Sequence, residues 1–269
     1  MAYTFGFIGC GNMGGARAAA AAKTLPGCDI LLSDHDSARA EALADKLGAC
    51  SGGNETAAAE SRFLFLGVKP QMMEDLLTSI APVLRTRTDP FVLVTMAAGM
   101  TIARIQELAG GAYPTIRIMP NTPASVGAGM ILYAASATVS AEDKTAFLQN
   151  MAAAGVLDEL SEGLIDAGCA ISGCGPAFVD LFLEALADGG VECGLPRDKA
   201  LLYAAQMVLG SARLALESGT HPAVLKDRVC SPGGSTIVGV HTLESGAFRS
   251  TVMNAVSAAY AKTVDLGKK

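Results

Sequence analysis

Charged side chains are scarce in this sequence of 269 residues. They make up 17% of it, below the roughly one quarter of an average protein, whereas hydrophobic residues reach 51%. A monomer with so few charges would struggle to cover its surface, so the composition indicates large interfaces between subunits. The net charge is −6, which gives no support for nucleic acid or an anionic membrane as a partner.

Metal-binding side chains are few and scattered. The histidines stand far apart at His35, His221 and His241, so a histidine-based metal cage is not expected. The seven cysteines are odd in number and form no C-x-x-C pair, which argues against a disulfide framework and a zinc site. Unpaired cysteines suit a reducing compartment, so we expect a cytoplasmic protein without a metal ion.

The longest uncharged stretch is not a membrane span. It runs over Ile118–Ala141, and Pro120, Pro123 and two glycines interrupt it, so it cannot form a membrane helix. No basic segment precedes the first apolar strand at Tyr3, and we therefore expect no signal peptide.

Short apolar runs alternate with helical patterns over the first 160 residues. The runs are nearly continuous in apolar side chains, which is typical of parallel strands covered on both faces. The predicted strands are Tyr3–Gly9, Asp29–Asp34, Arg62–Lys69, Phe91–Ala97 and Thr115–Pro120, with Met130–Ala134 and Val156–Leu160 as an extension. Helical patterns include Ser37–Leu47, Met72–Leu84 and a stretch that starts at Ser140. Strands alternating with helices predict a doubly wound α/β domain over residues 1–160.

The pattern changes after about Ser161. No strong strand signal remains, and long helical stretches cover Pro176–Val191, Arg197–Ser218 and Ala247–Leu266. The first of these is apolar nearly all round, which is typical of a helix buried in a core or between subunits. Residues 161–269 are therefore expected to form an all-helical second domain.

A glycine motif follows the first strand. The segment Gly9-Cys10-Gly11-Asn12-Met13-Gly14 joins an apolar strand to a helix, which is the context that the G-x-G-x-x-G motif of dinucleotide-binding folds requires. The glycines allow a tight turn and the approach of a pyrophosphate, and N–H groups at the start of the helix face the phosphates. An ordinary glycine turn is the alternative interpretation.

Asp34 lies 20 residues beyond Gly14, where an acidic residue meets the adenosine ribose of a dinucleotide. Its carboxylate would repel a 2′-phosphate, so the sequence favours NADH, although His35 and Arg39 leave room for NADPH. A cap for the helix that begins near Ser37 is the simpler role, and the two roles are compatible.

Further chemistry is expected at the ends of other strands, where ligands bind in open α/β sheets. Val68-Lys69-Pro70 and Ala97-Ala98 follow two of the predicted strands. Lys69 either orients the cofactor or is a solvated lysine. The segment Asn121-Thr122-Pro123 is either structural or close to a nicotinamide.

The loop Cys230-Ser231-Pro232-Gly233-Gly234-Ser235-Thr236 is the most informative part of the second half. It is typical of a glycine-rich turn that enters a helix, and successive N–H groups in such a turn form a concavity for an anion such as a carboxylate. Ser231, Ser235 and Thr236 add hydroxyl donors. The alternative is a turn that only caps a helix.

Together these motifs resemble the pyrroline-5-carboxylate reductases over nearly the whole chain, in order and with matching spacing. The most specific segment is Leu225–Gly246, which is similar to the signature of that family. The other matching segments are Gly9–Gly14, Val68–Pro70, Ala97–Ile102, Arg117–Pro123, Ser172–Ala177, Asp188–Gly190 and Gly194–Pro196. The resemblance implies a Rossmann domain followed by a helical domain that interlaces in a homodimer, and dimers of this family commonly assemble into a homodecamer. It also implies an oxidoreductase that uses NADPH or NADH to reduce the C=N bond of 1-pyrroline-5-carboxylate to L-proline, the last step of proline biosynthesis.

The resemblance also implies roles for single residues. The cofactor-binding residues are Gly9, Gly11, Asn12, Met13 and Gly14 at the pyrophosphate, Ser33, Asp34 and Asn54 along the adenosine ribose, and Val68, Lys69, Pro70, Ala97, Ala98 and Arg228 elsewhere along the cofactor. The substrate-binding residues are Glu162, Ser231, Gly233, Gly234, Ser235 and Thr236. In the dimer the loop over residues 231–236 can serve the cofactor of the neighbouring subunit. A protonated C=N is already a good hydride acceptor, so orientation matters most, and Thr236 is the expected catalytic residue because its hydroxyl can hold or deliver the proton of the imine nitrogen.

Two other functions are compatible with parts of the sequence. A β-hydroxyacid dehydrogenase-like oxidoreductase shares a similar domain plan, but it moves a proton on an alcohol oxygen and needs a Lys or a His. The helix after Gly173 offers Val179, Asp180 and Glu184 and no lysine in that turn. A non-enzymatic NAD(P)-sensing protein would be expected to have a decayed version of the loop over residues 231–236, which is intact here.

Overall fold

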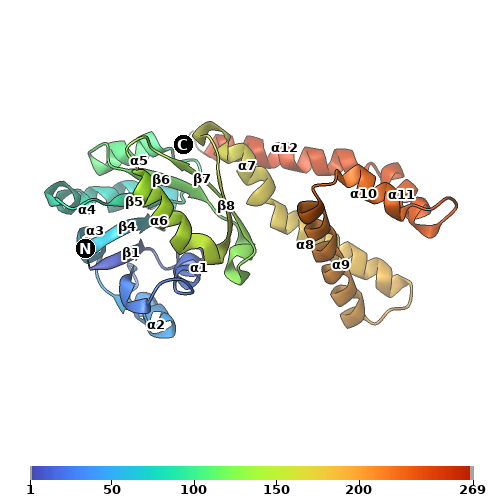
Figure 1. Ribbon diagram of the computed structural model, residues 1–269, viewed down its shortest axis with the longest axis horizontal. Coiled ribbons are helices and arrows are strands. Elements are labelled where there is room, and N and C mark those ends of the chain that lie inside the picture. Colours follow the sequence, from blue (N-terminus) through green and yellow to red (C-terminus); the bar gives the residue numbers. More distant parts are fainter. Residues whose placement is uncertain (1, 267–269) are drawn as a thin grey trace. The chain divides into compact units, whose positions relative to one another are not determined.

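The computed structural model describes residues 2–266, apart from the side chains of Asn12 and Met13, and its first part contains an eight-stranded sheet (Figure 1). The strands are β1 (Tyr3–Ile8), β2 (Ile30–Ser33), β3 (Cys50–Ser51), β4 (Ser61–Leu66), β5 (Val92–Thr95), β6 (Thr115–Met119), β7 (Gly129–Ala135) and β8 (Gly155–Glu159). They are ordered β3-β2-β1-β4-β5-β6-β7-β8 across the sheet. The order reverses between β1 and β4, which is the switch point where dinucleotides bind in folds of this kind.

One strand pair departs from the parallel pattern. β6 and β7 pair antiparallel, whereas the other neighbours are parallel. The link between β6 and β7 is short and contains the 3-10 helix η3 (Thr122–Val126). A parallel connection needs a crossover of about a dozen residues or more, so the short link turns β7 back. The sequence predicts this strand but not its direction.

Helices cover both faces of the sheet. One face packs against α1 (Asn12–Ala21), α2 (Ser37–Leu47) and α6 (Ala141–Met151), and the other against α3 (Asn54–Glu60), α4 (Met73–Thr86) and α5 (Ile102–Ala109). Successive side chains of a strand point to opposite faces, so Phe63 and Phe65 belong to the first cluster and Leu64 and Leu66 to the second. Burial on both faces explains why the strands are nearly continuous apolar runs.

Phenylalanines form the centre of the first cluster. The rings of Phe7 and Phe65 are stacked with their centroids 4.3 Å apart, and Phe5 meets Phe63 edge-on at 5.4 Å. Phe147 of α6 covers Phe63 at 5.9 Å. These contacts hold β1 and β4 side by side, and the loops at the carboxyl ends of these two strands carry the glycine motif and Val68.

The remainder of the chain is helical as far as residue 266, where the description ends, as expected. Its helices are α7 (Ile165–Ser172), α8 (Gly175–Glu192), α9 (Arg197–Ser218), α10 (Pro222–Val229), α11 (Ser235–Ser245) and α12 (Phe248–Leu266). Contacts divide the chain into two compact units, one up to Gly173 together with the end of the chain from Ala259, and a second unit from Cys174 to Ala258. Within the second unit α8 packs against α9, and Phe182 of α8 contacts Phe248 of α12 with 5.9 Å between ring centroids.

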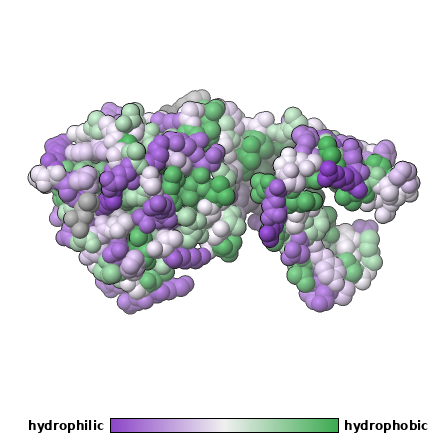
Figure 2. Space-filling view, in the orientation of Figure 1, coloured by the Kyte–Doolittle hydropathy of each residue, from purple (hydrophilic) through white to green (hydrophobic). Residues whose placement is uncertain are grey.

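The second unit exposes many apolar side chains, which appear as green areas in Figure 2. Leu181 of α8 is 67% exposed and Leu216 of α9 is 84% exposed. Among the described residues of α8, only Ala187 is buried. The apolar character of α8 therefore does not come from burial within the second unit, and burial between subunits stays the expected alternative. The helical stretch Glu162–Glu192 is also long and apolar enough to span a membrane, but a single helix of this kind is weak evidence for one.

Candidate active site

The glycine motif forms a tight turn between β1 and α1. Gly9 has a φ of +99°, and a Cβ there would lie 2.7 Å from the carbonyl of Gly67 after β4. A Cβ at Gly14 would lie 1.9 Å from the carbonyl oxygen of Gly9. Only glycine fits both positions, which is what close approach of a cofactor and of helix on strand requires. The N-cap of α1 is Gly11, and no described side chain caps it, so N–H groups of the first turn remain for an anion.

Asp34 ties the end of β2 to this turn. The backbone N–H of Cys10 donates to its Oδ2 at 2.6 Å, and that of Asp36 donates to its Oδ1 at 3.0 Å. His35 Nδ1 lies 2.7 Å from the same Oδ1. Burial alone would raise the pKa of Asp34, but these hydrogen bonds, with His35 and Arg39 nearby, lower it below its ordinary value. Asp34 is therefore a carboxylate at neutral pH.

The cap of α2 is a different residue. Asp36 occupies the N-cap and accepts from the backbone N–H of Arg39 at 3.4 Å. The alternative interpretation of Asp34 as a helix cap is therefore wrong, and its carboxylate instead stabilises the glycine turn. Cys10, which the sequence does not single out, is part of this arrangement. Burial and the charge of Asp34 raise the pKa of its thiol to about 11, so it stays protonated at neutral pH.

A cleft runs from the glycine turn along the ends of β1 and β4. Its lining brings together three residues expected along the cofactor, Gly9, Asn54 and Val68, and adds His35. The hydroxyl of Ser33 donates to Oδ1 of Asn54 at 2.6 Å, so a fourth expected residue holds the cleft wall in place. The structure therefore groups four of the residues assigned to the cofactor, of which Ser33 and Asn54 are assigned to the adenosine ribose.

The other predicted cofactor residues lie outside the strands, some in loops and some in helical turns. β4 ends at Leu66 and β5 at Thr95, so both strands are shorter than predicted. Lys69, Pro70 and Ala98 are exposed, whereas the side chain of Ala97 is buried in the core beneath them. Arg228 is exposed in the last turn of α10. Asn12 and Met13 belong to the first turn of α1, and their side chains lie outside what the structure describes.

Glu162 is engaged at the start of α5. Its Oε1 accepts from the backbone N–H of Ile102 at 2.6 Å and lies 3.7 Å from Nη1 of Arg117. Arg117 is buried and also donates to Asp166 at 2.6 Å. Glu162 therefore has a structural role that the sequence does not indicate, and its expected place beside the substrate stays a prediction.

Asn121 also has a structural role. Its Oδ1 accepts from the backbone N–H of Met130 at 3.0 Å, and its Nδ2 donates to the carbonyl of Ser172 at 3.0 Å. Its own carbonyl accepts from Arg17 of α1 at 3.2 Å. The amide side chain is therefore used within the protein, which favours the structural interpretation of Asn121-Thr122-Pro123.

In the second unit, the loop before α11 presents hydroxyl groups to solvent. Gly233 has a φ of +70°, which favours glycine, whereas a Cβ at Gly234 would require the side chain of Ser231 to move. Ser231, Ser235 and Thr236 are exposed. The N-cap of α11 is Gly234, and within the described residues no side chain caps this helix. The first N–H groups of α11 are thus available to an anion, with hydroxyl donors beside them.

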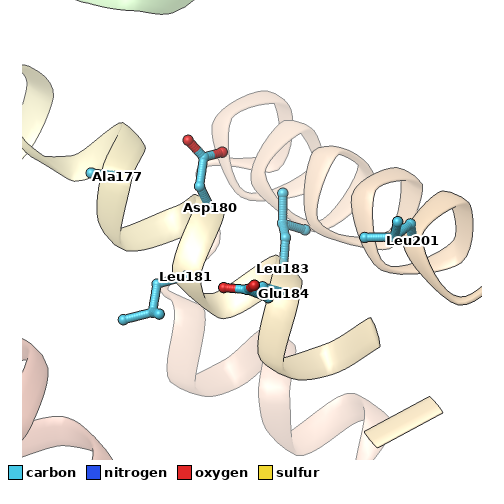
Figure 3. A pocket seen from close by; sticks show the side chains of 6 residues that line it. All are labelled: Ala177, Asp180, Leu181, Leu183, Glu184 and Leu201. Atoms are coloured by element: carbon cyan, nitrogen blue, oxygen red, sulfur yellow. The ribbon is translucent and has the colours of Figure 1, made fainter. Parts of the chain in front are cut away.

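A separate hollow of the second unit lies between α8 and α9 (Figure 3). Asp180 and Glu184 stand one helical turn apart on α8, and Leu201 lies opposite on α9. The remaining lining residues are Ala177, Leu181 and Leu183. This lining contains neither a Lys nor a His, so the hollow lacks the proton-transfer group that a hydroxyacid dehydrogenase needs.

Known proteins similar to this chain cover its full length. Residues 162–266 match the family model described as pyrroline-5-carboxylate reductase dimerisation, and residues 4–99 match the model described as NADP oxidoreductase, coenzyme F420-dependent. The pyrroline-5-carboxylate reductase of Glycine max is 41% identical over 267 residues, which cover 98% of this chain and 96% of that protein. The pyrroline-5-carboxylate reductase of Escherichia coli (strain K12) is 38% identical over 267 residues, covering 98% of each.

Two solved structures are also similar over nearly their whole length. Plasmodium falciparum pyrroline carboxylate reductase with NADP bound gives a TM-score of 0.87 at 32% identity, covering 98% of each chain. The pyrroline-5-carboxylate reductase from Coxiella burnetii gives a TM-score of 0.87 at 31% identity, covering 99% of each.

Proposed function

This chain belongs to the pyrroline-5-carboxylate reductase family, and from that membership we propose which of its residues carry out the reaction. It is an oxidoreductase that reduces the C=N bond of 1-pyrroline-5-carboxylate to L-proline with NAD(P)H, in proline biosynthesis. Its first part is a Rossmann-type domain and its second a helical dimerisation domain. We place the division at residues 160 and 161, which lies just after β8 and just before the start of the matched dimerisation model.

The glycine turn is proposed to hold the pyrophosphate of the cofactor. The uncapped start of α1 fits such a group. Gly9 and Gly14 fit it as well, because neither position admits a Cβ. When bound, the nicotinamide supplies the hydride. Ser33, Asp34 and Asn54 hold the adenosine ribose, and Val68, Lys69, Pro70, Ala97, Ala98 and Arg228 complete the list of residues along the cofactor. The charged, well-held carboxylate of Asp34 supports use of NADH at least as well as NADPH.

The loop before α11 is proposed to bind the imine. The carboxylate of the substrate lies at the N–H group of Ser235, with the hydroxyl of Ser231 as a further donor. Gly233 and Gly234 give the turn its shape, and the N–H of Gly234 donates to the carbonyl of Ser231 at 3.0 Å within it. Thr236 holds the proton on the imine nitrogen while the C=N bond is reduced. The observation that carries this proposal is that the hydroxyl groups are exposed and α11 has no side-chain cap among the described residues, so a cap is not their function. Glu162 is proposed to lie on the substrate side as well.

One pair of assays tests the function and the cofactor proposal. Oxidation of NADH and of NADPH should be followed separately with 1-pyrroline-5-carboxylate, and proline should be identified as the product. A short-chain β-hydroxyacid with NAD or NADP serves as the control substrate for the alternative dehydrogenase. Turnover of the hydroxyacid without turnover of the imine would contradict the assignment as an imine reductase.

The family model of the second half is a dimerisation model, so the working unit is a homodimer. We propose that the dimers assemble further into a homodecamer, that the enzyme is cytoplasmic, and that it works without nucleic acid or membrane. The abundance of exposed apolar side chains in the second unit supports extensive subunit contacts. Light scattering of the purified enzyme distinguishes a dimer from a decamer.

A further inference from the structure

Arg17 is a buried arginine that has no carboxylate partner among the residues that the structure describes. It lies in the second turn of α1, is 1% exposed, and is one of the largest fully buried side chains of the structure. Its Nη2 donates to the carbonyl oxygen of Asn121 at 3.2 Å, whereas Nε and Nη1 have no hydrogen-bond partner in the described part of the chain. Burial lowers the pKa of Arg17 to about 10, so the guanidinium still carries its charge at neutral pH.

Stability does not explain an arginine at this position. A buried cation without an anion costs free energy, and an apolar residue of similar volume is often neutral or stabilising in its place. Ala18, Ala20 and Ala21 of the same helix belong to the hydrophobic cluster on that face of the sheet, so an aliphatic side chain would suit the surroundings. The positive charge of Arg17 therefore points to a negatively charged group that is bound during the reaction.

The position of Arg17 fits the phosphates of the cofactor. It follows the N-cap Gly11 by six residues, and side chains on a helix lean towards the N-terminus. Its partner Asn121 follows β6 at the carboxyl edge of the sheet, where ligands bind in such folds. The hydrogen bonds of Asn121 to Met130 and Ser172 fix that carbonyl in turn. The guanidinium is therefore held at Asn121, just beyond the carboxyl end of β6.

We propose that Arg17 is a positioning residue for NAD(P)H, and that its buried positive charge attracts the pyrophosphate to the N-terminus of α1. The inference rests on the proposed binding of the pyrophosphate at the glycine turn. The helix end itself contributes only partial charges, whereas a guanidinium contributes a full one. Because the charge is buried, salt screens its attraction much less than that of a surface arginine.

The test is cofactor binding by Arg17→Met, which keeps the length of the side chain and removes its charge. We expect the Kd for NADH, for NADPH and for ADP-ribose to rise about tenfold each, because all three carry the pyrophosphate. The loss should persist at high salt, the KM for the imine at saturating cofactor should not change, and Tm should stay level or rise. Titration of NADH fluorescence and competition by ADP-ribose give these constants.

Four further variants make the result decisive. Arg104→Met removes the same charge from an exposed arginine of α5 and should bind NADH as the wild type does. Arg17→Lys keeps a cation and should retain most of the affinity, whereas Arg17→Gln should not, and this pair serves if Arg17→Met fails to fold. Equal affinities of the Lys and Gln variants, or wild-type binding of ADP-ribose by Arg17→Met, overturn the inference. Gly14→Val tests the glycine turn separately: if it binds NADH normally, the proposed pyrophosphate site itself is wrong.

Discussion

At the scale of single residues, Asp34 has two tasks at one carboxylate. Its oxygens hold the backbone of Cys10 and of Asp36, and its charge faces the place proposed for the adenosine ribose. Replacement by a short side chain removes both, whereas replacement by the amide of the same shape removes the charge and keeps one acceptor oxygen. The two tasks can therefore be separated by choice of substituent.

We expect Asp34→Ser to raise the ratio of kcat/KM for NADPH over NADH, because the repulsion of a 2′-phosphate is lost. Asp34→Asn should shift the ratio in the same direction by about tenfold and stay closer to the wild-type Tm. Steady-state kinetics with each cofactor measure the ratio. A wild-type enzyme that strongly prefers NADPH by kcat/KM would show that Asp34 does not select the cofactor.

Thr236 is the second residue on which the mechanism depends. Reduction turns an imine into a basic amine, and a hydroxyl beside that nitrogen can hold the proton throughout. Thr236→Ala should lower kcat by about 10²-fold or somewhat less, with a smaller effect on the KM for NADH. Thr236→Ser keeps the hydroxyl and should lose far less, and Ser231→Ala should mainly raise the KM for the imine. If Thr236→Ala turns over at the wild-type rate, the catalytic assignment fails.

At the scale of secondary-structure elements, Glu162 fastens the start of α5. Loss of its carboxylate in Glu162→Ala leaves the N–H of Ile102 without its acceptor and removes a negative charge 3.7 Å from the buried Arg117. This should cost about 1–3 kcal/mol and lower Tm by several degrees. Glu162→Gln offers the same N–H an amide oxygen and should recover most of that loss. Thermal denaturation of both variants measures the structural role.

Kinetics of the same pair test the proposed place of Glu162 beside the substrate. We expect Glu162→Gln to raise the KM for the imine while its Tm stays near that of the wild type. An unchanged KM in that variant would leave Glu162 with its structural role alone.

The sequence predicts the helices and strands whose buried residues form a long pattern of apolar side chains. Strands covered on both faces appear as continuous apolar runs, and α9 has the bounds that its pattern predicts. The seven-residue α3, which buries only Ala57 and Ala58, is too short for a helical period to emerge. α5 could have been found, because Thr101 caps it by accepting from the N–H of Arg104 and Ile102 and Ile105 form its buried face.

The candidate site divides in a similar way. The glycine turn and the loop before α11 are visible in the sequence because their function needs particular residues in consecutive order. The bonds of Cys10 to Asp34 and of Arg17 to Asn121 join residues 24 and 104 positions apart, and no local pattern announces them. Such tertiary partners decide the charge state and position of a side chain, so the sequence proposes roles that only the fold can refine.

At the scale of the whole molecule, the second unit has more apolar surface than a monomer can leave in water. Leu181 on α8 and Leu202, Leu209 and Leu216 on α9 are each about half exposed or more. The family model matched by this part is one of dimerisation, so we expect a second copy to cover these helices. The low proportion of charged residues in the sequence has the same explanation.

The last prediction concerns this surface. Leu181→Lys combined with Leu209→Lys places two charges where the partner subunit is expected to pack, and a charge buried without a counterion is strongly unfavourable. We expect the double variant to sediment and scatter light as a monomer, and to lose most of its activity because the loop over residues 231–236 is proposed to serve the cofactor of the neighbouring subunit. Val156→Lys, on an equally exposed apolar residue of β8, should change neither property. The wild type should remain at least dimeric at assay concentration. A stable monomer with full activity would contradict the proposed dimeric site, because each chain would then bind and reduce the imine alone.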